Sequence, residues 1–218
     1  MNKTFEELHQ IGLVPVIKID KPEDAVPLAL ALLEGEVGCA EITFRTSAAR
    51  EAIQRISEEV HEMLVGAGTV LTVQQAEQAV EAGAQFIISP GFDVAVVDWC
   101  QARQIPVLPG AITPTEITMA LAKGLRLLKF FPAEEFSGVR MLKAFYGPYP
   151  EVRFVPTGGI NVNNLAEYLA LPNVVACGGS WMVKDSLISA GQFHEITRLA
   201  REARAIVHRV RGERVVNQ

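Results

Sequence analysis

The sequence predicts an α/β protein, a single (β/α)8 TIM barrel, and two observations lead to this fold class. Short apolar runs rich in β-branched residues alternate along the chain with segments whose apolar residues recur at helical spacing. Eight such units follow one another in 218 residues without a break in composition, which suits a barrel at the compact end of its range of about 200–250 residues. We therefore expect one barrel domain over residues 1–218.

The predicted strands and helices take their bounds from this periodicity. The strands are Val14–Ile19, Ala40–Phe44, Leu64–Thr69, Phe86–Ser89, Val107–Gly110, Leu125–Phe131, Arg153–Thr157 and Val174–Cys177. The helices are Pro22–Glu34, Ala48–Val60, Val73–Ala82, Val94–Gln104, Pro114–Lys123, Val139–Tyr146 and Asn163–Leu171, with an N-terminal helical segment near 3–12 and a C-terminal helix near 193–210. Thr72, Thr113 and Asn161 stand where helix N-caps are expected.

A doubly wound open sheet is the alternative α/β architecture. Such a sheet normally carries a glycine-rich turn after its first strand. The segment Val14–Asp20 contains no glycine, so the sequence favours the barrel.

Composition narrows the possible functions. The chain is 49% hydrophobic with a formal net charge of −5, which argues against a broad nucleic-acid or membrane surface. With no apolar run of about 18 residues and no recognisable secretory leader, we expect a cytoplasmic protein. Cys39, Cys100 and Cys177 are scattered and the four histidines show no ligand spacing, so no disulfide framework, metal or cofactor is expected. The C-terminal arginines predict a solvated helix face.

Lys129 is the residue that first points to chemistry. It is the one charge in Leu127–Pro132, which otherwise resembles a buried strand. An unpaired ammonium is costly to bury, and a lysine that loses its charge is a nucleophile for carbonyl carbons. The structural alternative is a strand-end lysine whose head reaches water. Lys18 is a rival nucleophile, but its neighbour Asp20 predicts an ordinary charged side chain.

The strand Ala40–Phe44 brings further polar groups to the same place. Because alternate strand residues share a face, Glu41, Thr43 and Arg45 are expected inside the barrel mouth. The same alternation points Lys129 toward Glu41. A lysine electron sink, a proton-moving carboxylate and a guanidinium that holds a substrate carboxylate together suit Schiff-base chemistry. A structural Glu41–Arg45 ion pair is the alternative.

Two glycine pairs, Gly158-Gly159 and Gly178-Gly179, follow the last two strand candidates, and Ser180 follows the second pair. Loops at these two positions form a phosphate site in many barrels, because glycines let backbone N–H groups approach the anion. A single glycine pair is usually a turn. Two pairs at the two expected strands predict a phosphorylated substrate.

Two other strand ends carry weaker signals. The small residues of Gly66–Thr69 predict either close approach of a ligand or tight packing in the barrel. Phe131 is expected to form an apolar wall over the site, with a core phenylalanine as the alternative.

Six segments, in chain order and spread over most of the chain, are together similar to one enzyme family. They are Glu41–Thr46, Val65–Val70, Ile88–Gly91, Lys129–Glu134, Pro156–Ile160 and Gly178–Trp181. These segments resemble the 2-keto-3-deoxy-6-phosphogluconate (KDPG) aldolases, class I enzymes that often share 4-hydroxy-2-oxoglutarate (KHG) aldolase activity. The strings KFFPAE and PTGGI are the most specific of them.

The resemblance implies a role for each matched residue. It implies that Lys129 forms the Schiff base and Glu41 transfers protons. The expected substrate-binding residues are Arg45 and Thr69 at the pyruvyl carboxylate, Pro90, Phe131 and Thr157 along the pocket, and Gly158, Gly159, Gly179 and Ser180 at the phosphate. It further implies a homotrimer that needs no metal and no organic cofactor.

The reaction implied by the resemblance is cleavage of 2-dehydro-3-deoxy-6-phosphogluconate to pyruvate and D-glyceraldehyde 3-phosphate, a step of the Entner–Doudoroff pathway. Cleavage of 4-hydroxy-2-oxoglutarate to pyruvate and glyoxylate is a second expected activity. The galactonate epimer is an alternative substrate. An epimerase on the same barrel would explain the glycine pairs but not Lys129, and a non-catalytic sugar-phosphate binder would leave Glu41 and Lys129 without a purpose.

Two segments depart from the family pattern. Glu134–Ser137 replaces a smaller, glycine-containing stretch, and Gly35–Cys39 is unusual before the second strand. The first follows the strand of Lys129, so it leaves the specificity for the aldehyde half of the substrate open.

Overall fold

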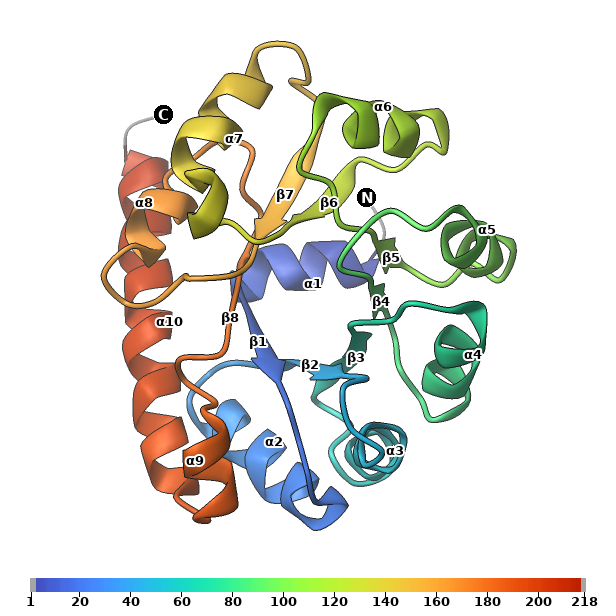
Figure 1. The fold of residues 1–218 in the computed structure, drawn as a ribbon. Helices are drawn as coiled ribbons and strands as arrows, with labels where there is room; N and C mark the ends of the chain where they lie inside the picture. The colour runs from blue at the N-terminus through green and yellow to red at the C-terminus, as the bar shows by residue number, and fades with distance from the viewer. Residues whose placement is uncertain (1–2, 217–218) are drawn as a thin grey trace.

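Within residues 3–216, which the computed structural model describes, eight strands lie around a central axis and helices surround them (Figure 1). The strands are β1 (Leu13–Ile17), β2 (Cys39–Thr43), β3 (Leu64–Gly68), β4 (Ile87–Ile88), β5 (Val107–Leu108), β6 (Leu127–Phe130), β7 (Arg153–Pro156) and β8 (Cys177–Gly179). The helices are α1 (Lys3–Ile11), α2 (Ala25–Glu34), α3 (Ala49–Glu59), α4 (Val73–Glu81), α5 (Val94–Ala102), α6 (Pro114–Ala122), α7 (Gly138–Tyr146), α8 (Leu165–Leu169), α9 (Asp185–Ser189) and α10 (Phe193–Val216). Short 3₁₀ helices η1 and η2 cover Pro22–Asp24 and Glu134–Phe136.

The strands form a curled parallel sheet, which confirms the α/β class. Six of them pair in the order β5-β4-β3-β2-β1-β8, and β6 pairs with β7 in a separate two-stranded ladder. The described residues therefore do not form the continuous eight-stranded ladder that the predicted barrel requires. The curled six-stranded sheet is the larger unit, and β6–β7 lies beside it.

Isolated bridges join the two ladders at two seams, one between β5 and β6 and one between β7 and β8. The bridges are Gly110–Lys129, Phe154–Val174 and Thr157–Gly178. A proline stands at each seam, Pro109 directly after β5 and Pro156 at the end of β7. Proline has no N–H to donate, which accounts for single bridges where a longer ladder was predicted.

Strand β8 lies later in the chain than the sequence predicted. The expected strand was Val174–Cys177, whereas the observed strand is Cys177–Gly179 and pairs with β1. The strand has glycines because the neighbouring strand leaves no room for a side chain. A Cβ added at Gly178 would lie 2.2 Å from Thr157 Oγ1. Periodicity could not predict this, since it depends on a side chain of another strand.

The helix caps follow the predicted residues in two cases of three. Thr72 accepts a hydrogen bond from Gln75 N at the start of α4, and Thr113 forms a capping box at α6. The cap expected at Asn161 is wrong, because α8 begins after Asn164 and the Asn161 side chain instead accepts from Asn163 N. Helix α9 was not predicted, and α10 extends past the expected end at residue 210.

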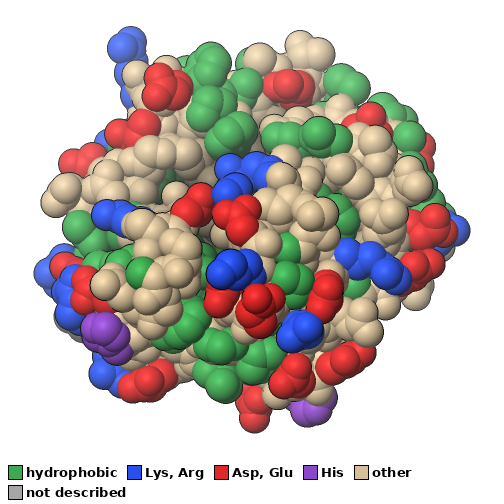
Figure 2. All heavy atoms as spheres, turned by 60° about the horizontal axis from the view of Figure 1, so that its bottom comes forward, with side chains coloured by type: hydrophobic (Ala, Val, Ile, Leu, Met, Phe, Trp, Pro, Cys, Tyr) green, Lys and Arg blue, Asp and Glu red, His purple; other side chains and the backbone are tan. Residues whose placement is uncertain are grey.

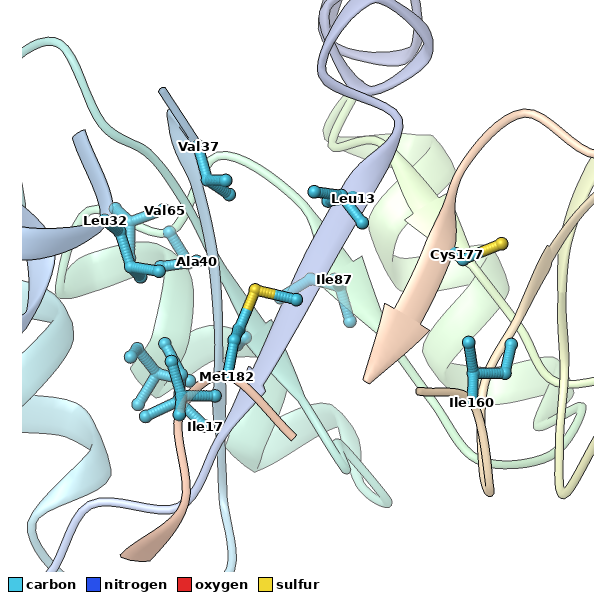
Figure 3. Close-up of a cluster of buried hydrophobic side chains, with 14 of the residues drawn as sticks. Leu13, Ile17, Leu32, Val37, Ala40, Val65, Ile87, Ile160, Cys177 and Met182 are labelled. Atoms are coloured by element: carbon cyan, nitrogen blue, oxygen red, sulfur yellow. The ribbon is translucent and has the colours of Figure 1, made fainter. Parts of the chain in front are cut away.

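Two clusters of buried side chains follow from the alternation of strand residues. The inner cluster consists of Leu8, Val14, Cys39, Leu64, Phe86, Ile88, Leu108, Leu127, Val155, Val175 and Ala176. The larger outer cluster fills the space between strands and helices, and Figure 3 shows Ala40, Val65 and Leu32 close together within it. In β2, Cys39 belongs to the inner cluster and Ala40 and Ile42 to the outer one. The parity predicted for this strand is therefore confirmed.

Helix α1 closes one end of the inner cluster. Its Leu8 is fully buried there, and Phe5 and Ile11 pack against the same cluster. Figure 1 shows α1 lying across the ring of strands. Because this end is filled with apolar side chains, room for a ligand is left at the opposite end, where the strands have their C-termini.

Three arginines of α10 join it to other parts of the chain, while Arg198 and Arg209 remain exposed on the solvated face that the sequence predicted. Arg201 pairs with Glu34 of α2 at 2.9 Å, Arg204 donates to Ile11 O at 2.7 Å, and Arg211 donates to Val175 O at 2.7 Å. On the face in Figure 2, basic and acidic side chains are interspersed. None of the helices described is long and apolar enough to cross a membrane.

We expect Gly66→Ala to destabilise the fold. Gly66 on β3 faces Phe86 of the inner cluster, and an added Cβ would lie 2.3 Å from the ring. Because overpacking displaces neighbouring side chains, the free energy of unfolding should fall by about 1–3 kcal/mol, measured by urea denaturation. Gly147→Ala is the matched control, since its added Cβ would lie 3.8 Å from the nearest atom. Equal stability of the two variants would contradict this account of the packing.

Candidate active site

Apart from Glu41, the predicted site residues lie at the C-terminal ends of strands or in the turns that follow them. Glu41 lies in the middle of β2 with Arg45 just beyond its end, Thr69 follows β3 and Pro90 follows β4. Lys129 and Phe131 lie at the end of β6, Thr157–Gly159 follow β7, and Gly179 ends β8 before the exposed Ser180. The fold thus brings residues from six strands to one end of the ring of strands.

Lys129 and Glu41 form a buried ion pair. Lys129 Nζ lies 3.1 Å from Glu41 Oε1, and the two side chains are 6% and 1% exposed. The β2 and β6 strands are four steps apart in the strand order, so the pair spans the interior instead of joining neighbours. Lys129 is therefore a buried, paired lysine, and the alternative of a strand-end lysine reaching water is wrong.

The second carboxylate oxygen of Glu41 is buried without a hydrogen-bond partner. The carboxylate rests on the backbone of β3, because a Cβ added at Gly68 would lie 2.1 Å from Glu41 Oε1. A buried, unpartnered oxygen is costly in a folded protein. Glu41 therefore presents a free acceptor beside the Lys129 amine.

Apolar groups and backbone surround Lys129 on its own side of the site. Its Nζ lies 5.5 Å from the centroid of the half-exposed Phe131 ring, an arrangement in which the ring face favours the ammonium. Gly110 bridges Lys129, and a Cβ at Gly110 would lie 2.0 Å from Pro90 O. Phe131 therefore lies beside the Lys129 amine, and Pro90 lies against Gly110, the residue that bridges Lys129.

Arg45 is held by a hydroxyl, not by Glu41. Arg45 Nε donates to Thr43 Oγ1 at 3.0 Å, and the Thr43 hydroxyl donates to Ile17 O at 2.8 Å. Thr43 is fully buried whereas Arg45 is exposed, so the terminal N–H groups of the guanidinium remain available at the mouth of the site. The alternative of a structural Glu41–Arg45 pair is wrong, because the partner of Glu41 is Lys129.

The two glycine pairs have different surroundings. Gly158 and Gly159 form a turn after β7 with φ of +100° and +78°, values that glycine adopts without strain. The second pair, expected in a loop, lies within β8, and Gly179 faces the Trp181 ring. The first pair therefore supplies a turn with accessible backbone, and the second supplies a strand end.

Sequence reasoning missed the contacts made by Glu134, which was noted only as part of an unusual segment. Its carboxylate accepts a hydrogen bond from the hydroxyl of Tyr168, a fully buried residue of α8. Burial and the neighbouring carboxylate raise the pKa of Tyr168 above its ordinary value. A tyrosine on an apolar helix face was the available signal, but nothing in the sequence linked it to Glu134.

Other ionisable groups have structural surroundings. Lys18 pairs with Asp20 at 2.8 Å and Asp185 at 3.5 Å, and the hydrogen bond to Asp20 raises the pKa of Lys18, so it is the charged lysine that was predicted. Burial raises the pKa of Cys100 to about 11. Among the side chains of residues 3–212, no group of three or more His, Cys, Asp or Glu is arranged to hold a metal ion.

A buried lysine paired with a carboxylate, at the C-terminal ends of parallel strands, defines an enzyme that acts on carbonyl compounds through lysine. Comparison with protein families identifies which one. The family model described as "Aldolase: KDPG and KHG aldolase" matches residues 5–199. The chain belongs to this family, which confirms the resemblance of its six segments, and it is a class I aldolase, a carbon–carbon lyase.

Curated relatives agree with the family model. A 2-dehydro-3-deoxy-phosphogluconate aldolase of Treponema pallidum is 52% identical over 203 residues, 93% of this chain and 97% of that protein. A KHG/KDPG aldolase of Escherichia coli is 48% identical over 191 residues, 88% of this chain and 90% of that protein. Such coverage means that the relatives match the chain over nearly its whole length.

Solved structures share the fold. A KDPG aldolase from Legionella pneumophila, with pyruvate captured as a covalent carbinolamine intermediate, has a TM-score of 0.90 and 40% identity. The match covers 93% of this chain and 98% of that one. A thiamine phosphate pyrophosphorylase from Pyrococcus furiosus, 18% identical with a TM-score of 0.66 over 93% of this chain and 98% of that one, shares the fold alone.

Because Lys129 and Glu41 are buried together, we expect replacing one of them to destabilise the fold more than replacing both. Lys129→Met leaves the Glu41 carboxylate buried without its partner and should lower the free energy of unfolding by about 3–5 kcal/mol. Adding Glu41→Leu to Lys129→Met removes the stranded charge and should recover most of that loss. Guanidinium denaturation of both single variants and the double variant measures the coupling. A double variant whose loss equals the sum of the single losses would show that the two charges are not coupled.

Proposed function

We propose that the protein cleaves 2-dehydro-3-deoxy-6-phosphogluconate to pyruvate and D-glyceraldehyde 3-phosphate through a Schiff base on Lys129. The observation that carries the proposal is the buried Lys129–Glu41 pair, 3.1 Å apart, with one oxygen of Glu41 unpartnered. A covalent amine and a free carboxylate acceptor at one point are what cleavage next to a carbonyl group requires.

Lys129 supplies the electron sink in the proposed mechanism. Its neutral amine attacks the C2 ketone, and the carbinolamine takes up a proton at its hydroxyl and loses water to give an iminium ion. When the C4 hydroxyl gives up its proton, the C3–C4 bond breaks and its electron pair moves into the iminium, leaving an enamine. The aldehyde fragment departs, C3 of the enamine takes a proton, and water releases pyruvate and the free amine.

Glu41 moves both protons. Its unpartnered oxygen accepts the proton of the C4 hydroxyl, and the same carboxyl group then protonates C3 of the enamine. One group is sufficient because the proton taken in the cleavage step is the proton needed next. As the proton moves to Glu41 the iminium on Lys129 becomes a neutral enamine, so both charges of the buried pair disappear in the cleavage step.

The remaining predicted residues bind the substrate. Arg45 and Thr69 are proposed to hold the carboxylate next to the ketone, since the guanidinium is exposed at the mouth with only its Nε engaged by Thr43. The pocket walls proposed are Pro90, Phe131 and Thr157. The proposed phosphate-binding residues are Gly158, Gly159, Gly179 and Ser180, of which the first two form a turn with positive φ.

A second activity, cleavage of 4-hydroxy-2-oxoglutarate to pyruvate and glyoxylate, is supported by the name of the Escherichia coli relative, KHG/KDPG aldolase. Both substrates contain the same ketone, carboxylate and C4 hydroxyl, so Lys129, Glu41 and Arg45 would serve both. The galactonate epimer differs at C4, next to Glu41, and we propose it as the weaker substrate.

We also propose the assembly and setting of the enzyme. The eight strands are proposed to work as one barrel, since bridges join the ladders at both seams.

A homotrimer is supported by large apolar side chains that are exposed on the single chain, such as Leu71 and Phe136. Light scattering would measure the mass of the assembly. A cytoplasmic location is supported by three buried, unpaired cysteines.

Incubation with pyruvate followed by borohydride should leave a stable adduct on Lys129, located by peptide mass mapping. Lys129→Arg should remove both the adduct and turnover, because guanidinium is not a nucleophile at neutral pH. Lys18→Arg is the matched control and should keep both. An adduct on Lys18, or turnover that stops when a chelator is added, would refute the proposal.

Glu41→Gln should separate binding from proton transfer. Loss of a positioned base lowers kcat by about 10²–10⁴-fold, while pyruvate should still be trapped on Lys129. The measurements are steady-state cleavage and exchange of the pyruvate methyl protons into deuterated water, and both rates should fall together. Unchanged proton exchange in the variant would mean that another group protonates the enamine.

A further inference from the structure

We propose that Tyr168 and Glu134 form a positioning pair that sets the preference of the active site for a phosphorylated substrate. The inference rests on the proposed function, specifically on phosphate binding at Gly158 and Gly159. Glu134 is the residue whose charge acts on the phosphate, and Tyr168 acts through Glu134.

Glu134 lies directly against the proposed phosphate turn. A Cβ added at Gly159 would lie 2.5 Å from Glu134 Cγ and 2.6 Å from its Cβ. The backbone is fixed as well, because Glu134 N donates to Gly158 O at 3.1 Å. The stem of this acidic side chain therefore rests on the α-carbon of a residue whose N–H is proposed to bind phosphate.

Tyr168 fixes where the carboxylate stands. Its ring is fully buried in the outer cluster, and its hydroxyl donates to Glu134 Oε1. The hydroxyl oxygen packs against Gly138, where an added Cβ would lie 2.4 Å from Tyr168 Oη. Since its pKa is raised, the phenol keeps its proton at neutral and mildly alkaline pH and remains a donor.

The position of the Glu134 carboxylate matters for phosphate binding because this carboxylate is negatively charged. None of the ion pairs formed by the described residues includes Glu134, so no cation neutralises it there. A carboxylate that is free to move over the turn competes for its N–H groups and repels a phosphate dianion. Held by Tyr168, the carboxylate stays at a buried hydroxyl and the turn remains open to phosphate.

The test compares a phosphorylated and an unphosphorylated substrate in three variants. Tyr168→Phe should raise KM for 2-dehydro-3-deoxy-6-phosphogluconate about tenfold and leave KM for 4-hydroxy-2-oxoglutarate within about twofold, with little change in kcat. Glu134→Gln should leave KM for the phosphorylated substrate at or below the original value. Adding Glu134→Gln to Tyr168→Phe should restore it. Because the repulsion is electrostatic, high salt should reduce the effect of Tyr168→Phe.

Controls separate this inference from the proposed function. Tyr149→Phe is the matched variant, since the Tyr149 hydroxyl donates to Pro114 O, and it should behave like the original protein. Pyruvate trapping on Lys129 is measured in every variant. If the original protein is not trapped, the proposed function fails. If trapping is intact but Tyr168→Phe raises both KM values equally, or Glu134→Gln raises KM for the phosphorylated substrate, the positioning role is overturned.

Discussion

The ion pair between Lys129 and Glu41 is the constraint around which the rest of the interior is arranged. It joins β2 and β6 across the ring of strands, with 3.1 Å between the charged atoms and almost no exposure of either side chain. Two long side chains can meet there only if their neighbours are small. Gly66 and Gly68 on β3 provide that space, the first for Phe86 beneath the pair and the second for the Glu41 carboxylate.

The interior is thus divided into two levels with different physical roles. The lower level is an apolar cluster closed by α1, and it supplies burial and stability. The upper level carries charges, an unpartnered carboxylate oxygen and an arginine held by a threonine. Such groups lower the free energy of unfolding, and the burial of the apolar side chains in the lower level offsets that loss.

Features that depend on local pattern could be predicted from the sequence, and features that depend on distant contacts could not. Alternation along β2 and β6 predicted that Glu41 and Lys129 share the inward face, because parity is a local property, and the predicted barrel then brought the two together. The Tyr168–Glu134 bond and the strand pairing of Gly178 depend on residues far apart in the chain. The glycines of Gly66–Thr69 indicated either tight packing or close ligand approach, and the contacts of Gly66 and Gly68 are tight packing.

The proline seams have a consequence for how the lysine is anchored. Strands β6 and β7 are joined to each other by a full ladder but to their outer neighbours only by isolated bridges. Lys129 itself makes one of those bridges, since its N–H donates to Pro109 O at 3.0 Å and its carbonyl accepts from Ala111 N at 2.9 Å. The backbone of the nucleophile is therefore tied to a strand on each side, and its side chain reaches across to the carboxylate from a fixed base.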